Sequence, residues 1–215
     1  SLRPETLRGV ELGVDFLPSR STVLRLNTFL NKVEDAILDY TIGTSTANGQ
    51  VFTECGPVPR NQACRQRRNV AGLRTLGLES ELELHPAAHW SIWGSYTFNP
   101  TRVDAPGDEI DGKLARGAAK HMASATITFD QPRLATITVE QRYVGARQDD
   151  DLNTTPLKRF FVTGVRVSRQ LVPQATAYVK VENLFDTRYE VTRSTNGYVE
   201  VAMPRWITVG VKSSW

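Results

Sequence analysis

The sequence predicts an all-β protein whose strands form an antiparallel, up-and-down sheet. Three observations carry this prediction. Apolar and polar residues alternate along most of the chain, no stretch has a sustained helical period, and short and long connections alternate between the expected strands. A period of two residues is typical of a strand with one apolar and one polar face.

About nine strands are expected from this alternation. The clearest covers residues 133–144, where Ile137 and Val139 alternate with Thr136 and Thr138. The expected strands cover, in order, residues 7–17, 21–34, 73–84, 89–99, 121–129, 133–144, 159–170, 175–184 and 205–215.

The connections between these strands are short and long in strict alternation. Each short one contains a proline, which turns favour; they are LPSR at 17–20, HPAA at 85–88, DQPR at 130–133 and LVPQ at 171–174. The long ones cover 35–72, 100–118, 145–157 and 186–203. In an up-and-down sheet, this order places all tight turns at one end and all long loops at the other. A Greek-key sandwich has no reason to keep that order, whereas outer-membrane β-barrels have it.

Strand length and aromatic residues favour a transmembrane barrel. Most expected strands reach the ~9–11 residues that cross a bilayer when tilted. Aromatic residues also collect near the strand ends, as membrane barrels require at both interfaces. Those at the tight-turn end are Phe16, Trp90, Phe129 and Trp215. Those towards the long-loop end are Tyr96, Phe98, Tyr143, Phe160 and Trp206. Aromatic residues in the core of a soluble β protein remain the alternative, because a period of two does not indicate which face of the sheet contacts water.

Composition argues against several other classes. The net charge is +3 and basic residues are not concentrated on one element, so nucleic-acid binding is not expected. No apolar run approaches the ~20 residues of a membrane-spanning helix. The opening residues SLRPETLRGVELG lack the apolar core of a signal peptide, so the start of an exported protein would be missing here.

The two cysteines, Cys55 and Cys64, lie in a segment rich in Gly, Pro, Asn and Gln, which predicts a loop. Two cysteines that close a short exposed loop indicate a disulfide and an oxidising compartment. Two separate free thiols are the alternative. A zinc site is not expected, because no His or second Cys pair lies nearby.

The segment YVKVENLFDTRYEV, residues 178–191, resembles the penultimate strand of TonB-dependent outer-membrane receptors. That strand ends in NLFD and is followed shortly by an aromatic residue. The matching positions are Asn183, Leu184, Phe185, Asp186 and Tyr189. Further segments resemble strands of the same family in the same order: SLRPETLRGVELGVDF at 1–16, RQRRNVAGLRTLGLESELE at 65–83 and MPRWITVGVKSSW at 203–215.

The resemblance implies a location in the bacterial outer membrane and an assembly signal at the C-terminus. In the family, the barrel-assembly machinery recognises a last strand that ends on an aromatic residue. Here the signal would comprise Trp206, Val209, Val211 and Trp215, with Trp215 in a place that Phe usually takes. A periplasmic C-terminus makes the tight turns periplasmic and the long loops extracellular.

The chain also departs from the family, whose complete members have 22 strands and an N-terminal plug that carries the TonB box. About nine strands and no plug are expected in residues 1–215. An odd number of strands cannot close an antiparallel barrel, and an open edge is not tolerated in lipid. Residues 1–215 are therefore expected to be the C-terminal part of a receptor barrel, an open curved sheet when taken alone.

No catalytic constellation or metal site is expected, and the chain is not expected to be an enzyme or to need a cofactor. The three histidines lie apart: His85 and His89 flank a tight turn and His121 begins a strand. The most basic segment lies in the longest loop, next to the cysteines, where it could attract an anionic ferric siderophore. It comprises Arg60, Arg65, Arg67 and Arg68. A solvated loop, or contact with lipopolysaccharide phosphates, is the alternative.

Two acidic clusters lie in other long loops and could offer oxygen ligands to calcium. They are Asp149, Asp150 and Asp151, and Asp104, Asp108, Glu109 and Asp111. Neither matches an EF-hand, so solvated acidic loops are the favoured interpretation. Other charged residues alternate with apolar ones within strands and would line the barrel and face the plug. These are Glu79, Glu81, Glu83, Arg142, Lys180 and Glu182.

The resemblance implies a role in active import of a scarce nutrient across the outer membrane, with energy from TonB acting through the plug. A ferric siderophore is the favoured cargo, and cobalamin or a similar nutrient is the alternative. The other implied partners are outer-membrane lipid, lipopolysaccharide and the barrel-assembly machinery. A non-transporting structural or adhesive barrel is the alternative function. A soluble β protein is a third, and it would need no detergent.

Overall fold

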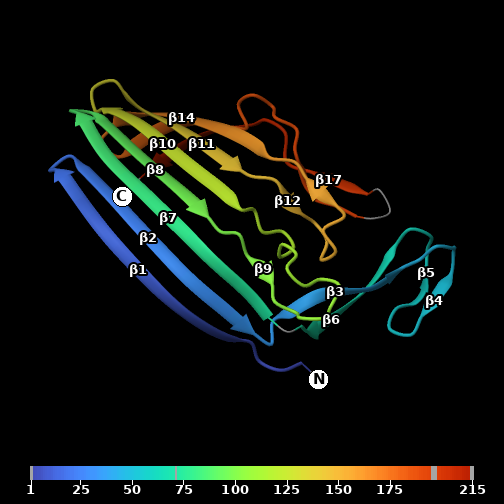
Figure 1. The fold of residues 1–215 in the computed structure, drawn as a ribbon. Coiled ribbons are helices and arrows are strands. Elements are labelled where there is room, and N and C mark those ends of the chain that lie inside the picture. Colours follow the sequence, from blue (N-terminus) through green and yellow to red (C-terminus); the bar gives the residue numbers. More distant parts are fainter. Residues whose placement is uncertain (1, 71, 195–197, 214–215) are drawn as a thin grey trace.

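The computed structural model describes residues 2–70, 72–194 and 198–213, and every regular element in it is a strand. Nine strands follow one another in the order β1-β2-β7-β8-β10-β11-β14-β15-β18, and each is antiparallel to its neighbours. The sheet curls around an open interior (Figure 1), and the strand order places β1 and β18 at its two edges. In the part described, β1 pairs only with β2 and β18 only with β15, so the sheet does not close into a barrel.

The nine strands agree in number and order with those expected from the alternating pattern. Their bounds are β1 Thr6–Ser19, β2 Thr22–Glu34, β7 Gly72–Ala87, β8 Trp90–Phe98, β10 His121–Gln131, β11 Ala135–Val144, β14 Phe160–Val172, β15 Ala175–Glu182 and β18 Trp206–Ser213. The described residues contain no helix long and apolar enough to span a membrane.

All four tight turns lie at one end of the sheet and all four long connections at the other (Figure 1). Two of the turn prolines, Pro18 and Pro86, lie within the last residues of β1 and β7, where the pairing register shifts. Proline has no N–H to donate, so it is tolerated at such irregularities. β1 and β7 therefore extend slightly further than the sequence indicated.

The long connections are more ordered than the loops expected from the sequence. They form short ribbons: β3 Ile37–Thr44 pairs with β6 Ala63–Asn69, and β4 Gln50–Phe52 pairs with β5 Gly56–Val58. The later ribbons are β12 Arg147–Gln148 with β13 Pro156–Leu157, and β16 Glu190–Arg193 with β17 Val199–Val201; β9 Arg102–Val103 pairs with β7. Apart from β3 and β6, these strands have only two to four residues, so they give little hydrophobic periodicity to read.

Alternation gives the nine-stranded sheet an apolar face and a polar face. Cross-strand pairs such as Val14–Leu26 and Val139–Val165 lie on the apolar face. Charged residues occupy the alternate positions, where Arg25 lies 3.0 Å from Glu81 through Nη1 and Oε1, and the Trp93 indole donates to the same oxygen. The charged residues expected to line the barrel all occupy polar-face positions: Glu79, Glu81, Glu83, Arg142, Lys180 and Glu182.

The aromatic belt at the long-loop end differs from the expected one at two positions. Phe160 and Trp206 occupy polar-face positions, opposite Val144 and Glu182. Phe161 takes the place on the apolar face, where its ring lies 4.6 Å from that of Tyr143 between centroids. The error arose because the sequence indicates how far along a strand a residue lies, but at a strand end it does not indicate which face of the sheet the side chain occupies.

Candidate functional site

The long connections pack against one another and form one loop cluster at their end of the sheet (Figure 1). We name its parts the first loop (residues 35–70), the second loop (99–120), the third loop (145–159) and the fourth loop (183–205). A small apolar core lies under the first three. Its buried members are Val70, Val103, Ala105 and Ile110, with Leu38, Tyr40, Leu73 and Leu152 packed against them. The loop cluster therefore has a packed interior of its own.

Three consecutive carboxylates of the third loop hold the cluster together. Asp149, Asp150 and Asp151 are only 8%, 3% and 4% exposed, and each accepts hydrogen bonds. The expectation of a solvated acidic loop is therefore wrong for these three residues. A buried carboxylate is costly unless several donors surround it, and the neighbouring loops supply those donors.

Each carboxylate of the third loop has a different target. Asp151 accepts from the backbone N–H and the hydroxyl of Thr41 in the first loop, at 2.7 and 2.6 Å. Asp149 accepts from the Thr192 hydroxyl and, at 2.6 Å, from the Arg193 N–H in the fourth loop. Together they connect the third loop to the first and fourth loops.

Asp150 orders the third loop itself. Its carboxylate accepts from the backbone N–H groups of Thr154 and Thr155, at 3.0 and 2.7 Å, and from the Thr154 hydroxyl. Burial acts to raise the pKa of Asp150, but these hydrogen bonds and the charge of Arg65 outweigh it, so its pKa lies below the ordinary value. Asp150 is therefore held as a carboxylate at neutral pH.

The second loop is tied in by Asn153 and Arg116. Asn153 accepts from the Leu114 N–H at 2.8 Å and donates to the Leu114 carbonyl at 3.0 Å. The Arg116 guanidinium reaches Asp39 of the first loop at 3.3 Å and Asp149 at 3.7 Å. The third loop thus contacts all the others and fixes their positions.

The second acidic cluster is also structural in part. The Tyr40 hydroxyl donates to both carboxylate oxygens of Asp108, at 3.0 and 3.2 Å. Burial and this hydrogen bond raise the pKa of Tyr40 above its ordinary value. Asp111 accepts from the Ala105 N–H, and Glu109 is exposed. No three His, Cys, Asp or Glu residues are grouped to hold a metal ion in the part of the chain that the structure describes.

The four arginines of the first loop do not form one patch. Arg67 is exposed and pairs with Asp39 at 3.0 Å, while the Arg68 guanidinium lies 3.4 Å from the centroid of the Tyr40 ring. Arg65 and Arg67 leave β6 on one face and Arg68 on the other, because side chains alternate along a strand. Arg60 is exposed beyond β5, where its backbone N–H donates to Asn48.

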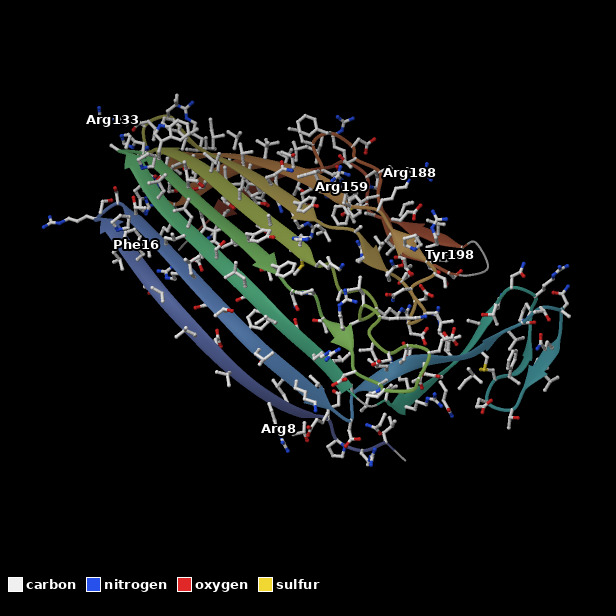
Figure 2. All side chains as sticks on the ribbon, in the orientation of Figure 1. Arg8, Phe16, Arg133, Arg159, Arg188 and Tyr198 are labelled. Carbon is white, nitrogen blue, oxygen red and sulfur yellow. A yellow bond between two sulfur atoms is a disulfide. The ribbon has the colours of Figure 1, made fainter. Side chains whose placement is uncertain are left out.

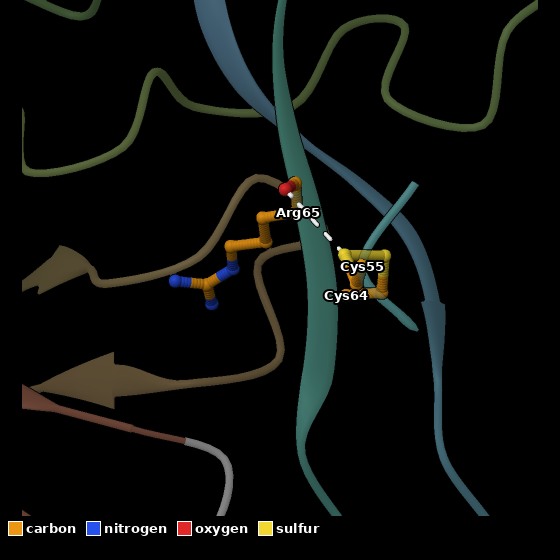
Figure 3. Close-up of a disulfide and its surroundings, with 3 residues drawn as sticks. All are labelled: Cys55, Cys64 and Arg65. Atoms are coloured by element: carbon orange, nitrogen blue, oxygen red, sulfur yellow. Dashed lines mark hydrogen bonds between the residues drawn. A yellow bond between two sulfur atoms is a disulfide. The ribbon is translucent and has the colours of Figure 1, made fainter. Parts of the chain in front are cut away.

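The sulfur atoms of Cys55 and Cys64 are bonded, with their Cα atoms 5.8 Å apart. The bond joins the segment after β4 to β6, and the Arg65 side chain leaves β6 on the opposite side (Figure 3). Cys64 is buried and Cys55 is exposed, with its Sγ 3.8 Å from the Arg65 carbonyl oxygen. The bond therefore stabilises the outer part of the first loop and does not touch the nine-stranded sheet.

The NLFD motif forms the turn by which the chain leaves β15. Asn183 is buried in the left-handed region at φ 52°, which asparagine tolerates better than most residues. Its side-chain amide donates to the carbonyls of Thr187 and Met203, and its Oδ1 accepts from the Thr187 N–H. Asp186 accepts from the Arg205 N–H at 2.8 Å, just before β18 begins. The motif thus connects the last two strands.

The other three motif residues are Leu184, Phe185 and Tyr189, and they differ in their contacts. Phe185 is 73% exposed, whereas Tyr189 stacks on Phe160 with ring centroids 3.8 Å apart. The Tyr189 hydroxyl accepts from Arg142 at 3.2 Å, which connects the fourth loop to the polar face. Leu184 contributes its backbone, because its N–H donates to the Thr163 carbonyl.

In the last strand, Val209 and Val211 lie on the apolar face, opposite Val179 and Ala177. Trp206 lies on the polar face and its indole donates to Thr208 at 3.1 Å. Trp215, the expected terminal element of the assembly signal, lies outside the described residues. The ring of His121 stacks on that of Tyr96, and its Nδ1 shares a hydrogen bond of 2.8 Å with the Tyr96 hydroxyl. His85 and His89 lie at the tight-turn end.

Several residues that build the loop cluster were not singled out from the sequence. Thr41, Arg116 and Asn153 are ordinary polar residues in loop segments, and no local pattern marks them. Their partners in the other loops are 33 to 110 residues away in sequence, and only the three-dimensional arrangement brings them together.

Comparison with known proteins identifies the chain. The model of the family described as "TonB dependent receptor-like, beta-barrel" matches residues 1–184. The chain belongs to this family, a class of outer-membrane receptors and transporters rather than enzymes. It is 27% identical to the ferrioxamine B receptor of Salmonella typhimurium (strain SL1344) over 156 residues, which are 69% of this chain and 22% of that receptor.

Solved structures of the same fold superpose on most of the chain. The ferric yersiniabactin uptake receptor FyuA from Yersinia pestis matches 96% of the chain with a TM-score of 0.75 and 18% identity, over 29% of its own length. The copper transporter OprC matches 100% of the chain with a TM-score of 0.74 and 14% identity, over 32% of its length. At this identity the likeness shows the fold. The chain spans about a fifth of the curated relative and about three tenths of these structures.

Proposed function

We propose that residues 1–215 form the C-terminal nine strands of a 22-stranded outer-membrane receptor that imports a ferric siderophore with energy from TonB. The open sheet is the observation that carries this proposal. Both edge strands, β1 and β18, present a row of backbone groups that lipid cannot satisfy, so further strands must pair with them in a membrane. The family match supports strands of the same barrel as those partners.

In this arrangement the apolar face meets lipid and the polar face meets the plug that TonB moves. The barrel-assembly machinery would recognise β18, with Trp206, Val209, Val211 and Trp215 as its signal. The tight turns lie in the periplasm, and the loop cluster faces the outside of the cell. The printed name of the ferrioxamine B receptor supports a siderophore as the cargo.

The arginines of the first loop have separate roles in this proposal. Arg60 and Arg67 are exposed and attract an anionic ferric complex towards the loop cluster. Arg65 and Arg68 are part of the packing, through the charge that Arg65 places near Asp150 and the stacking of Arg68 on Tyr40. Steering by exposed charges acts mainly on the association rate and weakens as salt rises.

Uptake of radioactive iron by the source bacterium tests this function. Cells that lack the gene are compared with complemented cells, each supplied with purified ferric siderophores of the hydroxamate, catecholate and phenolate classes. The proposal expects uptake of one class that requires both the gene and an intact TonB. The double variant Arg60→Gln, Arg67→Gln should lower the initial rate of uptake in low salt and leave the other properties of uptake unchanged. Arg133→Gln, at the tight-turn end, is the control and should not change this rate. Normal uptake of every class without the gene, together with lost cell attachment, would favour the adhesive alternative.

A further inference from the structure

A cleft of about 450 Å³ lies between the end of the third loop and the ribbon of the fourth loop. This volume is within the ~300–1,000 Å³ of small-molecule sites. The residues that line it are Lys158, Arg159, Arg188, Tyr189, Glu190, Val199 and Val201. Figure 2 shows Arg159 and Arg188 at the loop-cluster end of the molecule. The cleft is therefore separate from the exposed arginines of the first loop.

Three cations line this cleft. Lys158 and Arg159 are the last residues before β14, and Arg188 lies two residues before the start of β16. All three side chains are exposed, and none forms a hydrogen bond or an ion pair with residues that the structure describes. The cleft therefore holds three positive charges that have no partner in the described part of the chain.

The carboxylate that lines the cleft, that of Glu190, is already paired. Both of its oxygens accept from the Arg193 guanidinium, through Nε at 3.0 Å and through Nη2. The hydrogen bond from Arg193, followed by the charges of Arg193, Lys158 and Arg188, lowers the pKa of Glu190 below its ordinary value. Glu190 is therefore ionised at neutral pH, and Arg193 balances its charge.

The cleft also has an apolar and aromatic wall. Val201 is directly opposite Glu190, and Val199 is opposite Arg193, across the β16–β17 ribbon. Tyr189 lines the cleft as well, and its ring is fixed by stacking on Phe160, with centroids 3.8 Å apart. The cleft thus offers positive charge and apolar surface to the same ligand.

These two properties suit an anion that carries several charges and aromatic rings. Each catecholate group has two negative charges and each hydroxamate has one, so a ferric tris-catecholate is a trianion and a ferric tris-hydroxamate is neutral. We infer that the cleft binds a ferric tris-catecholate and selects it over hydroxamates, an inference that rests on the siderophore import proposed above. The three cations match the charge of the complex, and its rings pack against the valines and Tyr189. Arginine contributes twice, because its guanidinium pairs with anions and stacks on aromatic rings.

Equilibrium binding to the purified full receptor tests the inference. The probes are the iron complexes of a synthetic tris-catecholate and of a neutral tris-hydroxamate, and quenching of tryptophan fluorescence is the readout. The triple variant Lys158→Gln, Arg159→Gln, Arg188→Gln removes the cations of the cleft. Its matched control, Arg20→Gln, Arg133→Gln, Arg169→Gln, removes three exposed arginines towards the tight-turn end, where Figure 2 labels Arg133. Wild type and control should bind the tris-catecholate at least tenfold more tightly than the tris-hydroxamate, and the triple variant should lose this preference.

Two further arms separate the role of charge from the source of the ligand. Arg159→Lys with Arg188→Lys keeps the charges and should keep the preference; its loss in this variant would contradict selection by charge. Purified lipopolysaccharide should not displace the tris-catecholate, since displacement would assign the cleft to lipid phosphates and overturn the inference. An equal preference in wild type and the triple variant would also overturn it. If the triple variant does not assemble, Arg159→Gln alone decides, and it should weaken binding of the tris-catecholate only.

Iron uptake separates this inference from the proposed function. Cells may import a ferric hydroxamate or phenolate through the receptor and TonB, while the receptor shows no preference for the tris-catecholate. That result would contradict the inference and leave the proposed function intact. Absence of gene-dependent uptake for every class would contradict the proposed function, and the binding measurements would still decide the inference.

Discussion

The carboxylate of Asp151 accepts two hydrogen bonds from Thr41, a residue 110 positions earlier in the chain. Both residues are buried, and the two bonds join the third loop to the first. Asp149 and Asp150 make equivalent contacts to the fourth loop and within the third. Three adjacent residues therefore fix a surface built from four connections, and this explains why these aspartates do not point into water.

Replacing Asp151 with alanine should free the first loop without unfolding the barrel. The substitution leaves the buried Thr41 N–H without an acceptor, and hydrogen bonds to charged groups contribute about 1.5–3 kcal/mol each. A loss of about 3 kcal/mol would raise local opening roughly 100-fold. Limited proteolysis should then cleave within residues 35–70 much faster. Glu109→Ala, which removes an exposed carboxylate, is the control, and equal cleavage of the two variants would contradict the assigned role.

The third loop should lose order as the pH falls. The pKa of Asp150 is depressed in the folded state, so its carboxylate stabilises the loop above the pKa of an unfolded aspartate, about 3.9. This stabilisation disappears as pH falls through the lower, folded pKa. Hydrogen exchange of residues 150–155, corrected for intrinsic rates, should be slow at pH 7 and pH 5 and accelerate below about pH 4. Asp150→Asn should remove most of this pH dependence.

Asn183→Ala should destabilise the junction between the last two strands. It removes three side-chain hydrogen bonds, at about 1 kcal/mol each, and places alanine in a left-handed conformation. The temperature at which the folded receptor loses its fast-migrating form on unheated gels should fall by several degrees. Phe185→Ala changes the exposed neighbour and should leave this temperature unaltered; a similar fall in both variants would argue against the Asn183 contacts as the cause.

Reduction of the Cys55–Cys64 bond should affect the first loop alone. Closure of a loop of nine residues is worth about 2–3 kcal/mol in the chain-entropy model, and the bond contacts no strand of the main sheet. Peptide mapping of oxidised receptor should find the two cysteines linked. After reduction, proteolysis within residues 45–62 should accelerate while barrel stability stays constant. Free thiols in receptor isolated under non-reducing conditions would refute the pairing.

The sheet could be predicted from the sequence because each strand has its own local signal. Alternation such as that of Ile137 and Val139 with Thr136 and Thr138 identifies a strand without knowledge of its neighbours. Prolines near the short turns and the order of short and long connections then fix the topology. The NLFD motif could be located for the same reason, because the residues that define it are close together in the sequence.

The loop cluster could not be predicted, because its contacts join residues with no local relationship. Asp149 to Asp151 look like a solvated acidic run until Thr41, Arg116 and Thr192 are brought beside them. The sequence also does not indicate which face of the sheet a residue at a strand end occupies. Phe160 was therefore expected in the aromatic belt, where Phe161 lies instead. The juxtaposition of Arg8, Lys32, Arg74 and Arg102 depends on the register of four strands, and the sequence gives no sign of it.

The size of the folded species that contains these strands distinguishes part of a larger receptor barrel from a separate small protein. An antibody against residues 45–62 would be used on outer-membrane fractions of the source bacterium, with heated and unheated samples and intact-mass analysis. We expect a heat-modifiable outer-membrane polypeptide several times heavier than the 24.0 kDa of residues 1–215. A folded product of 24 kDa that is stable without detergent would contradict it.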